Sequence, residues 1–484
     1  MWVFKSFDKL STKHCLFFAI VLYLFFAYFN YGHNTGDEYS QIYEFAAYKI
    51  GYVHYADLRL WEYDTHMRPG FQVWIVYELY QFMHLFNADV NIFGLNYIIQ
   101  AGSALLSIFA CFLSFKVLSK DFNHAYSKLF VLLSLFTWLG IYTSLHFNGE
   151  NISGKLYFIS VLLILLALDK KTWYYFALSG IIFGMAFASR FQITFSALGV
   201  FLWLIIARKI SLKHLLILLV SSLISIGIFN VVIDHWFYGQ WVFSAYNYYY
   251  QNMVTGTMNS YGTDPFYTYI PMLLGYFPWG PIYVVATAWF IYRKPKHLFT
   301  AAIVPFFVIH SIIGHKEVRF MLPMIAFMPY IITTWLDKIN FINKFHSQKP
   351  YRITAKIVIW LNLIAFISML IPAATEIGGW RYISQNYSQP TTIYYNAVKD
   401  RKLLFYIKPN IKLIPINSAS EINCNNIPTC LYLLDADRVE SNVPGELKYS
   451  FFPLWMAKYN YNNWMKNVGH FNIYEINSST RQAK

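Results

Sequence analysis

The sequence is poor in charged residues, and above all in acids. Only 13% of its 484 residues are charged, with 24 Asp and Glu in all, against about 25% charged residues in soluble domains. Apolar residues make up 57% of the chain and aromatic residues 20%. Apolar runs recur along it, many close to the roughly 20 residues that a membrane-spanning helix needs. The composition excludes an ordinary soluble domain and predicts a polytopic, mainly α-helical membrane protein.

The chain also lacks the signatures of nucleotide and metal sites. No Gly-rich nucleotide-binding loop is evident, and the four cysteines and 14 histidines show no spacing that suggests zinc. We therefore expect no cofactor and identify no residues as metal ligands. Use of a divalent metal ion is left open. Cys15 and Cys111 lie in apolar runs and are expected to be inert. Cys424 and Cys430 lie in a polar tail and could pair in an oxidising compartment.

The excess of basic residues, which gives a net charge of +14, is explained by membrane topology and not by nucleic-acid binding. About half of the Lys and Arg residues fall in the segments that alternate apolar runs would place in the cytoplasm, as the positive-inside rule requires. A further group lies in the tail. We therefore expect no nucleic-acid partner.

We predict about eleven spanning helices, with the N-terminus inside and the C-terminus outside. They lie near residues 15–32, 92–115, 129–146, 152–168, 172–190, 191–207, 214–233, 269–292, 298–314, 318–335 and 357–374. No small-residue cleavage site follows the first, which is expected to be a retained anchor. The run Phe71–Phe86 is apolar but interrupted by Gln72, Glu78, Gln81 and His84. We predict that it forms a helix in the membrane interface.

Two domains are expected. Residues 1–374 would form the membrane domain, with a first outer loop at 33–90 and a second at 234–268. Residues 375–484 are polar, with turn-like Asn and Pro clusters between short apolar stretches. This tail predicts a small mixed α/β domain outside the membrane.

The scarce acids are concentrated just after the first apolar run. Six of the 24 lie between His33 and Pro69. Adjacent carboxylates at a membrane surface, here Asp37 and Glu38, are suited to take a proton from a hydroxyl. The alternative is a pair of solvated loop residues.

Other ionisable residues fall on the same predicted outer side. Such residues at membrane depth are costly and usually line a functional cavity. Glu150 follows the third predicted helix, and Arg190 ends the fifth, where an interfacial anchor is the alternative. If a helix begins at Lys316, His315 and Arg319 lie four apart on one face and can grip a lipid-linked phosphate. The alternative is snorkelling, with Glu317 paired to Lys316 or Arg319.

The order and identity of these motifs resemble the Alg9-like mannosyltransferases, glycosyltransferase family 22, which include those of GPI-anchor and N-glycan assembly. The resemblance covers about residues 15–335. The matching motifs are Gly36-Asp37-Glu38-Tyr39-Ser40-Gln41 with Glu44 soon after, Trp61-Glu62-Tyr63, Arg68-Pro69, Asn148-Gly149-Glu150, Phe237-Tyr238-Gly239-Gln240-Trp241-Val242-Phe243, Asn252, Tyr261-Gly262-Thr263-Asp264-Pro265 and His315-Lys316-Glu317-Val318-Arg319-Phe320. Thr35-Gly36 stand where the family usually has His-Pro, and Asp264 where it commonly has His.

The resemblance implies a GT-C fold and inverting transfer from a polyprenyl-phosphate sugar such as dolichyl-phosphate mannose. Asp37 would be the general base for the acceptor hydroxyl. The phosphate leaving group needs cations, and His315, Lys316, Arg319 and Arg190 would supply them. The matched positions expected to bind the acceptor or substrate are Glu38, Arg68, Glu150, Tyr261 and Asp264, with orientation of its neighbour Asp37 as the alternative for Glu38.

The sequence thus predicts a multipass glycosyltransferase that moves a sugar, expected to be mannose, to a glycan or glycolipid hydroxyl on the extracytoplasmic face. The membrane would be a bacterial plasma membrane or the endoplasmic reticulum. One alternative is a transporter or flippase of lipid-linked saccharides, which should need charges in a path between both faces. The predicted inner halves of the helices are nearly free of them. The other is a glycan polymerase or ligase with a lipid-diphosphate donor.

Overall fold

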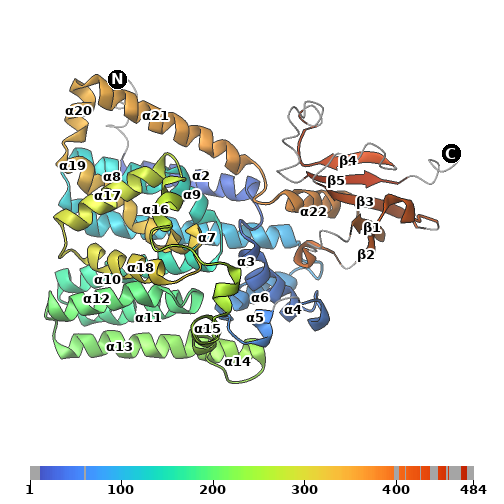
Figure 1. Ribbon diagram of the computed structural model, residues 1–484, viewed down its shortest axis with the longest axis horizontal. Helices are drawn as coiled ribbons and strands as arrows, with labels where there is room; N and C mark the ends of the chain where they lie inside the picture. The colour runs from blue at the N-terminus through green and yellow to red at the C-terminus, as the bar shows by residue number, and fades with distance from the viewer. Residues whose placement is uncertain are drawn as a thin grey trace. The chain divides into compact units, whose positions relative to one another are not determined.

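The computed structural model describes residues 11–58, 61–396, 403–408, 410–425, 427–436, 445–453, 456 and 470–476 (Figure 1). The chain packs as two units. The first comprises Met1–Phe29, Arg59–Leu79 and Ile98–Leu370, and the second Asn30–Leu58, Tyr80–Tyr97 and Ile371–Lys484. The sequence suggested one boundary after residue 374. In the structure the start of the first loop, with Asp37 and Glu38, belongs to the same unit as the tail.

The first unit is built from helices. Up to the end of α13 its helices are α2 (Thr12–Phe29), α5 (Trp61–Asp64), α6 (Phe71–His84), α7 (Ile92–Leu118), η3 (Ser119–Asp121), α8 (His124–Phe136), α9 (Trp138–Leu145), α10 (Gly149–Lys170), α11 (Trp173–Ser189), α12 (Ile193–Ile206) and α13 (Leu212–Ile226). The last turn of α6 and the first turns of α7 belong to the second unit.

The later helices of this unit include several short and irregular ones. They are η4 (Gly227–Val232), α14 (Ile233–Tyr238), α15 (Ser244–Tyr249), η5 (Tyr250–Val254), η6 (Thr257–Tyr261), α16 (Tyr269–Leu274), α17 (Trp279–Arg293), α18 (Leu298–Ile312), η7 (Val318–Phe327), α19 (Met328–Lys338), α20 (Phe341–Ser347), α21 (Lys349–Ala365) and η8 (Phe366–Leu370). Of these, η4 and η5 are π-helical.

Six helical segments among the described residues are long and apolar enough to cross a membrane, or up to eight if two bent helix pairs each form one span. The six are Thr12–Phe29, Ile92–Asp121, Gly149–Lys170, Leu212–Tyr238, Val318–Lys338 and Lys349–Leu370. The pairs are α8 with α9, bent by 45°, and α17 with α18, bent by 120°.

The sequence predicted about eleven spans. By length and composition, the described residues of the structure contain six to eight candidates. All eleven expected segments fall largely on helices. The two numbers differ because an apolar run in the sequence does not show how short the helix in it is, or where that helix breaks. α11 and α12 have only 17 and 14 residues, and Thr137 interrupts α8–α9 with extended backbone (φ −79°, ψ 133°). α6 is not among the candidate spans, and its interfacial position stays a prediction.

Small residues set the close packing of the helices in this unit. α10, α11, α13, α12 and α18 lie side by side (Figure 1). A Cβ on Gly180 of α11 would lie 2.0 Å from Ser221 Oγ of α13, and one on Gly184 would lie 2.3 Å from Ser225 Oγ. Because membrane helices gain little from the hydrophobic effect, such close approaches are what holds them together.

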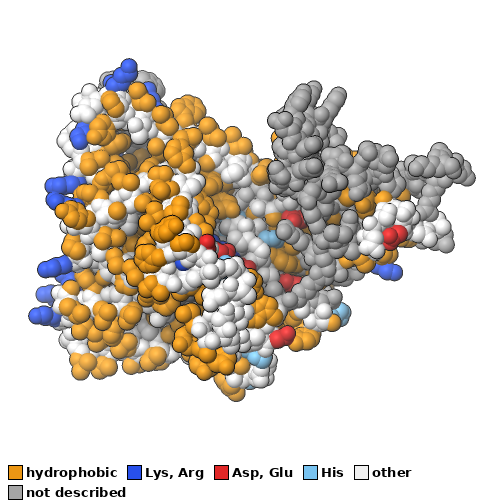
Figure 2. Space-filling model, viewed as in Figure 1, with side chains coloured by type: hydrophobic (Ala, Val, Ile, Leu, Met, Phe, Trp, Pro, Cys, Tyr) orange, Lys and Arg blue, Asp and Glu red, His pale blue; other side chains and the backbone are white. Residues whose placement is uncertain are grey.

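The basic side chains gather at one end of these helices, as Figure 2 shows for the face in view. α10 ends at Lys170, α17 at Arg293, and Arg208 follows the end of α12. The other ends of α10 and α11 carry Glu150 and Arg190. The positive-inside rule predicts such a gathering of basic residues at one end of helices that cross a membrane.

The second unit holds a five-stranded mixed sheet, as the sequence predicted for the tail. Its strands are β1 (Thr391–Asn396), β2 (Ile411–Ile416), β3 (Thr429–Ala436), β4 (Glu446–Ser450) and β5 (His470–Glu475), in the order β2-β1-β3-β5-β4. β1 pairs in parallel with β2 and β3, and β5 pairs antiparallel with β3 and β4. The helices are α3 (Gly36–Glu38), η1 (Tyr39–Glu44), α4 (Phe45–Ile50), η2 (Tyr55–Asp57), α22 (Thr375–Asn386), η10 (Leu404–Tyr406) and η11 (Ala419–Glu421).

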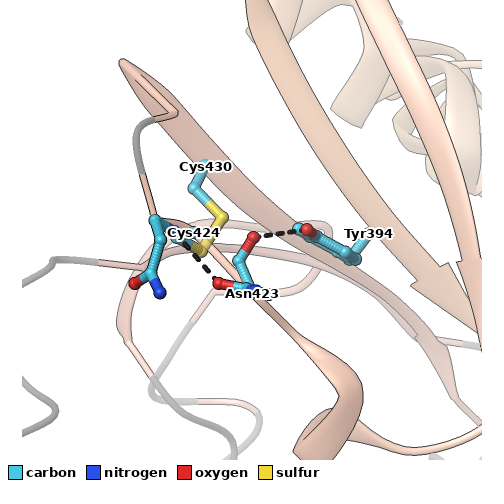
Figure 3. The surroundings of a disulfide bond; sticks show 5 residues. Tyr394, Asn423, Cys424 and Cys430 are labelled. Carbon is cyan, nitrogen blue, oxygen red and sulfur yellow. Dashed lines mark hydrogen bonds between the residues drawn. A yellow bond between two sulfur atoms is a disulfide. The ribbon is translucent and has the colours of Figure 1, made fainter.

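Cys424 and Cys430 form a disulfide beside the sheet, with their Cα atoms 5.8 Å apart (Figure 3). The predicted pairing is therefore confirmed. Both cysteines are buried in a cluster with Tyr394 and Tyr432, and the Tyr394 hydroxyl donates to the carbonyl of Asn423. The bond closes the short connection between η11 and β3.

Candidate functional site

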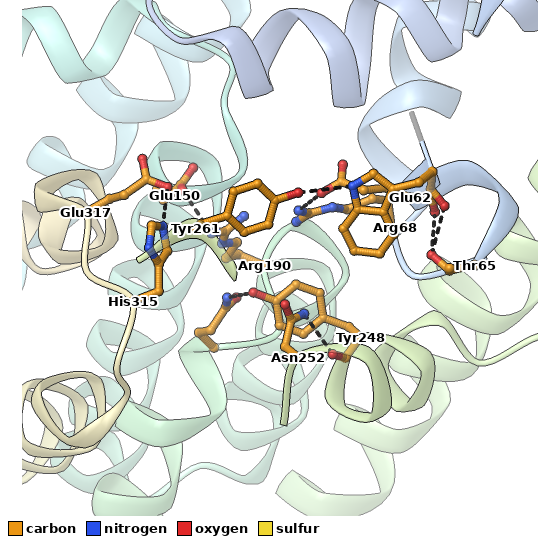
Figure 4. Close-up of polar contacts among 12 residues, drawn as sticks. Glu62, Thr65, Arg68, Glu150, Arg190, Tyr248, Asn252, Tyr261, His315 and Glu317 are labelled. Carbon is orange, nitrogen blue, oxygen red and sulfur yellow. Dashed lines mark hydrogen bonds and ion pairs between the residues drawn. The ribbon is translucent and has the colours of Figure 1, made fainter. Parts of the chain in front are cut away.

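Glu150 is the centre of a charged network in the first unit (Figure 4). It lies in the first turn of α10, which Asn148 caps by accepting from Asn151 N, and an acid is favoured at this end of the helix dipole. The Glu150 side chain is only 4% exposed, and its Oε1 lies 3.1 Å from Arg190 Nη2 and 3.9 Å from Arg319 Nε. Two arginines thus converge on one buried carboxylate.

Glu317 extends this network. It binds Arg319 through two contacts, Nε to Oε2 and Nη2 to Oε1, both of 2.7 Å, and His315 Nε2 lies 3.3 Å from its Oε1. A helix from Lys316, the condition for placing His315 and Arg319 on one helix face, does not form, because a 3-10 helix begins only at Val318 with Glu317 as its N-cap. His315 and Arg319 are therefore brought together by Glu317 and not by stacking on one helix face. For Arg319, the alternative of pairing with Glu317 is what the structure shows.

Lys316 lies apart from these ion pairs. It is 4% exposed, and its Nζ donates to the carbonyls of Asp264 (2.9 Å), Ile313 (2.7 Å) and Gly314 (3.3 Å). An ammonium group has three protons, so these contacts engage all of them. Lys316 acts as a tie between the loops of Asp264 and Gly314, and this geometry does not favour the expected role as a phosphate ligand.

Tyr261 lies beside the network. Its hydroxyl accepts from Trp61 Nε1 at 3.1 Å, and its ring centre is 5.9 Å from that of His315. Asp264 enters the same region through its backbone, since its N–H donates to Gly314 O. The matched motif around Tyr261 is thus fixed against the His315 loop.

Arg68 forms a second ion pair in the first unit, with Glu62, and both side chains are about nine-tenths buried (12% and 11% exposed). α14 fixes the Arg68 backbone, because the Tyr238 hydroxyl donates to Arg68 O (2.7 Å) and accepts from its N–H (3.2 Å). The Arg68 guanidinium lies 5.4 Å from the ring centre of Tyr248. Figure 4 shows this pair together with Tyr248 and Tyr261.

Asp234 and Lys155 are buried ionisable residues that the sequence analysis did not assign to the site. Asp234, fully buried on α14, accepts from Gly70 N at 2.8 Å and Asn230 Nδ2 at 2.9 Å, which holds the turn after Arg68. Lys155, on α10, donates to Ser103 Oγ and Ser144 O. The available signal was an ionisable residue inside an apolar run, which marks a functional or structural polar site by default.

An apolar, aromatic groove is lined by residues of α15, by the segment before it and by Phe187 of α11. Its cavity volume is about 580 Å³, and its lining residues include Phe187, Trp241, Phe243, Tyr246 and Tyr249.

Aromatic contacts join this groove to the charged site. Phe187 contacts Phe191 (ring centres 5.2 Å apart), Phe191 contacts Tyr248 (5.7 Å), and Tyr248 faces Arg68. Arg190 precedes Phe191 in the chain. Packed aromatic side chains thus link the lining of the groove to Arg68.

Asp37 and Glu38 belong to the second unit and form the short helix α3. The Thr35 hydroxyl caps it by accepting from Glu38 N at 3.1 Å. Glu38 is 1% exposed and accepts from Asn34 N at 2.8 Å, so the alternative of a solvated pair is wrong for Glu38. Asp37 is half-buried. The π-helix η1 follows at once, and π-helical turns are frequent at functional sites.

Comparison with known proteins now identifies the family. Residues 14–393 match the Alg9-like mannosyltransferase family. The chain belongs to this family. The match confirms the resemblance found in the motifs, and it ends within β1, so most of the sheet lies beyond it.

Two relatives illustrate the similarity. A probable Dol-P-Man:Man(7)GlcNAc(2)-PP-Dol alpha-1,6-mannosyltransferase of Schizosaccharomyces pombe is 31% identical over 159 residues, 32% of this chain and 29% of the relative. The GPI alpha-1,2-mannosyltransferase 3 of Bos taurus is 22% identical over 302 residues, 60% of this chain and 53% of the relative. The chain therefore spans about half or less of each relative's length.

Solved structures confirm the GT-C fold. ArnT from Cupriavidus metallidurans bound to undecaprenyl phosphate matches with a TM-score of 0.57 at 12% identity, over 96% of this chain and 98% of that one. The apo oligosaccharyltransferase of Archaeoglobus fulgidus matches with a TM-score of 0.50 at 10% identity, over 89% and 70%. At these identities the likeness extends to the fold alone.

Proposed function

We propose that the protein transfers a sugar, most simply mannose, from a polyprenyl phosphate to a hydroxyl of a glycan or glycolipid acceptor, with inversion. The observation that carries this proposal is the convergence of Arg190 and Arg319 on Glu150, in a chain of the Alg9-like mannosyltransferase family. Guanidinium groups bind phosphate bidentately. Two of them side by side form a site for a phosphate leaving group.

Glu150 has a different task in this proposal from the acceptor binding expected earlier. Two adjacent guanidinium groups repel each other, and a shared carboxylate between them offsets that repulsion. Glu150 keeps both arginines in place and oriented. Glu317 does the same for Arg319 and His315, and it is the most exposed member of the network, with 37% of its side chain accessible.

The proposed reaction needs only the donor, the acceptor and side chains of the protein. That the protein uses no cofactor stays a prediction. The acceptor oxygen attacks the anomeric carbon from the face opposite the phosphate. The bond from that carbon to the phosphate oxygen breaks, and the polyprenyl phosphate leaves as an anion stabilised by cations. The acceptor hydroxyl gives its proton to the Asp37 carboxylate, which is half-buried and so remains accessible.

The lipid part of the donor would lie in the aromatic groove. Lining residues such as Trp241 and Tyr246 are apolar rings, suited to a hydrocarbon chain, and Phe191 and Tyr248 lead from there to Arg68. A structure of ArnT, which has the same fold, was solved with undecaprenyl phosphate bound. That lipid is of the class we propose for the donor.

The reaction would take place on the extracytoplasmic face. Glu150 and Arg190 lie at the ends of α10 and α11 opposite to the basic ends. The disulfide Cys424–Cys430 fits an oxidising compartment for the tail. A bacterial plasma membrane and the endoplasmic reticulum both meet these conditions.

The test is a transfer assay with purified protein in lipid nanodiscs. Radiolabelled polyprenyl-phosphate mannose, a lipid-diphosphate oligosaccharide and GDP-mannose are offered separately with a cell lipid extract, and the product is identified by mass spectrometry. We expect transfer from the monophosphate donor, and a raised KM for that donor in Arg319→Ala. Transfer only from the diphosphate donor would favour a ligase, and transfer from GDP-mannose would overturn the proposal.

A further inference from the structure

We propose that η10, the turn Leu404–Tyr406 of the tail, is a positioning element for the loop that carries Asp37. This inference rests on the proposed role of Asp37 as general base. η10 lies beyond residue 393, where the family match ends. A segment outside the family-matched region would therefore complete the site of this enzyme.

Asn96 is the hub of the arrangement. It lies in the part of α7 that belongs to the second unit and is fully buried. Its Oδ1 accepts from Gly32 N at 2.9 Å, and its Nδ2 donates to the hydroxyls of Tyr43 at 3.1 Å and Tyr406 at 3.5 Å. One amide side chain thus joins the chain before Asp37, the π-helix after it, and η10.

A second contact ties η10 to the residue next to Glu38. The Tyr39 hydroxyl accepts from Phe405 N at 3.2 Å, and both residues are buried. Burial, the largest cause, raises the pKa of the Tyr39, Tyr43 and Tyr406 phenols well above their usual value. All three hydroxyls therefore stay protonated at physiological pH and keep their hydrogen bonds.

Aromatic packing surrounds these hydrogen bonds. Tyr406 stacks on Phe93, with ring centres 5.3 Å apart and an angle of 28°, and Phe405 lies 5.1 Å from Tyr43. His33 lies 5.0 Å from Tyr39 and stacks on Tyr406 at 6.4 Å. The rings of η10 thus pack on residues both before and after Asp37, so the helix α3 is held at both ends.

A fixed position matters more for a general base such as Asp37 than for most surface residues. A base must lie within hydrogen-bond reach of the proton that it takes, and a displacement of about 1 Å can reduce turnover about a hundredfold. The helix α3 has only three residues, Gly36–Glu38, and needs support from neighbouring elements. The tail supplies it through Tyr406 and Phe405, which are positioning residues and touch no reacting atom.

The experiment compares Tyr406→Ala and Tyr406→Phe with Tyr394→Ala as matched control. Tyr394 is a buried tyrosine of the same sheet domain, and its hydroxyl donates to Asn423 O. We expect Tyr406→Ala to lower kcat about tenfold to a hundredfold with the KM for donor unchanged. Tyr406→Phe keeps the rings stacked and should retain most activity. Tyr394→Ala should lower thermal stability at nearly normal kcat.

Hydrogen exchange of the peptide that spans residues 33–44 gives a readout without activity. It should become faster in Tyr406→Ala and stay unchanged in Tyr394→Ala. Combining Tyr406→Ala with Asp37→Asn completes the test, because residues that act through one another are not additive. We expect Tyr406→Ala to reduce turnover in the wild type and to have no further effect when Asp37 is Asn.

The outcomes separate the two proposals. A fully active Asp37→Asn enzyme would refute Asp37 as the base, whatever Tyr406 does. An inactive Asp37→Asn enzyme together with a Tyr406→Ala enzyme of normal kcat and normal exchange would refute the positioning role alone. Equal loss of kcat in Tyr406→Ala and Tyr394→Ala would do so too, because it would reflect damage to the domain as a whole.

Discussion

The guanidinium of Arg190 lies 3.1 Å from the carboxylate of Glu150, and the two side chains are only 11% and 4% exposed. The pair joins the end of α11 to the start of α10. Because both charges are largely removed from water, each depends on the other, and removing one partner of a buried pair commonly costs about 3–5 kcal/mol. The pair is therefore both a structural contact and the core of the proposed phosphate site, and mutations can separate these two tasks.

Glu150→Gln is expected to destabilise the protein and to abolish donor use, because it leaves Arg190 and Arg319 without their shared counter-ion. The double variant Glu150→Gln with Arg190→Gln removes both charges, and we expect it to recover much of the lost stability but none of the activity. Thermal unfolding in detergent and mannose transfer measure the two quantities. Recovery of activity in the double variant would show that neither charge serves the donor.

Arg319 and Lys316 lie close together in the sequence, but we expect their substitution to affect different properties. Loss of Arg319 should weaken donor binding, and loss of Lys316 should lower stability. Arg319→Ala, and to a smaller extent His315→Ala, should raise the KM for donor by about tenfold to a hundredfold, the equivalent of losing a charge-assisted hydrogen bond. Lys316→Met should instead lower stability by about 1–3 kcal/mol, because it removes the Lys316 donor from the partly buried carbonyls of Asp264 and Ile313. Donor titrations and thermal melts of both variants test this difference. A raised donor KM in Lys316→Met, without loss of stability, would return Lys316 to the phosphate site.

If the donor lipid lies in the aromatic groove, the effect of a groove mutation on the donor KM should depend on the length of the lipid. Trp241→Ala should raise the KM for a long polyprenyl donor by about tenfold and leave the KM for a donor of two isoprene units unchanged. Trp360→Ala is the control, because Trp360 on α21 is exposed to a similar degree, 64% against 68% for Trp241. An equal effect on both donors, or an equal effect of both variants, would remove the lipid chain from this groove.

The predicted orientation in the membrane can be tested with reporters in two places. Lys170, at the end of α10, should be cytoplasmic, and Lys412, exposed on β2, should lie on the opposite side because the basic loops mark the inside. Cysteine variants at both positions, labelled with a membrane-impermeant maleimide, report the side of each. Labelling of both from the same side would overturn the topology.

The sequence predicted the membrane class, the mixed tail domain and the residues of the charged network, because composition and short motifs carry these properties directly. It also predicted the disulfide, since Cys424 and Cys430 are six residues apart in one polar tail. It could not predict how His315 and Arg319 meet, because periodicity does not show that the backbone before Val318 is extended. Nor could it show that Asn96 contacts Tyr406, since a contact across 310 residues leaves no local pattern in either segment.

The last prediction concerns Asp37 itself. Asp37→Asn keeps the size of the side chain and much of its hydrogen bonding but removes its ability to accept a proton. General-base catalysis typically contributes about a hundredfold to ten-thousandfold, so turnover should fall by about that factor. Stability should change little, because Asp37 is only half-buried.

Glu38→Gln is the matched comparison on the same helix. Glu38 is buried and its carboxylate accepts from Asn34 N, so we expect this variant to lose stability more than Asp37→Asn does. Its loss of turnover should be smaller, because Glu38 supports the loop and does not take the proton. Transfer to the native acceptor and thermal melts of both variants decide the matter. If Glu38→Gln were the inactive variant and Asp37→Asn the active one, the base would be Glu38, and the loop would have to present its buried carboxylate to the acceptor.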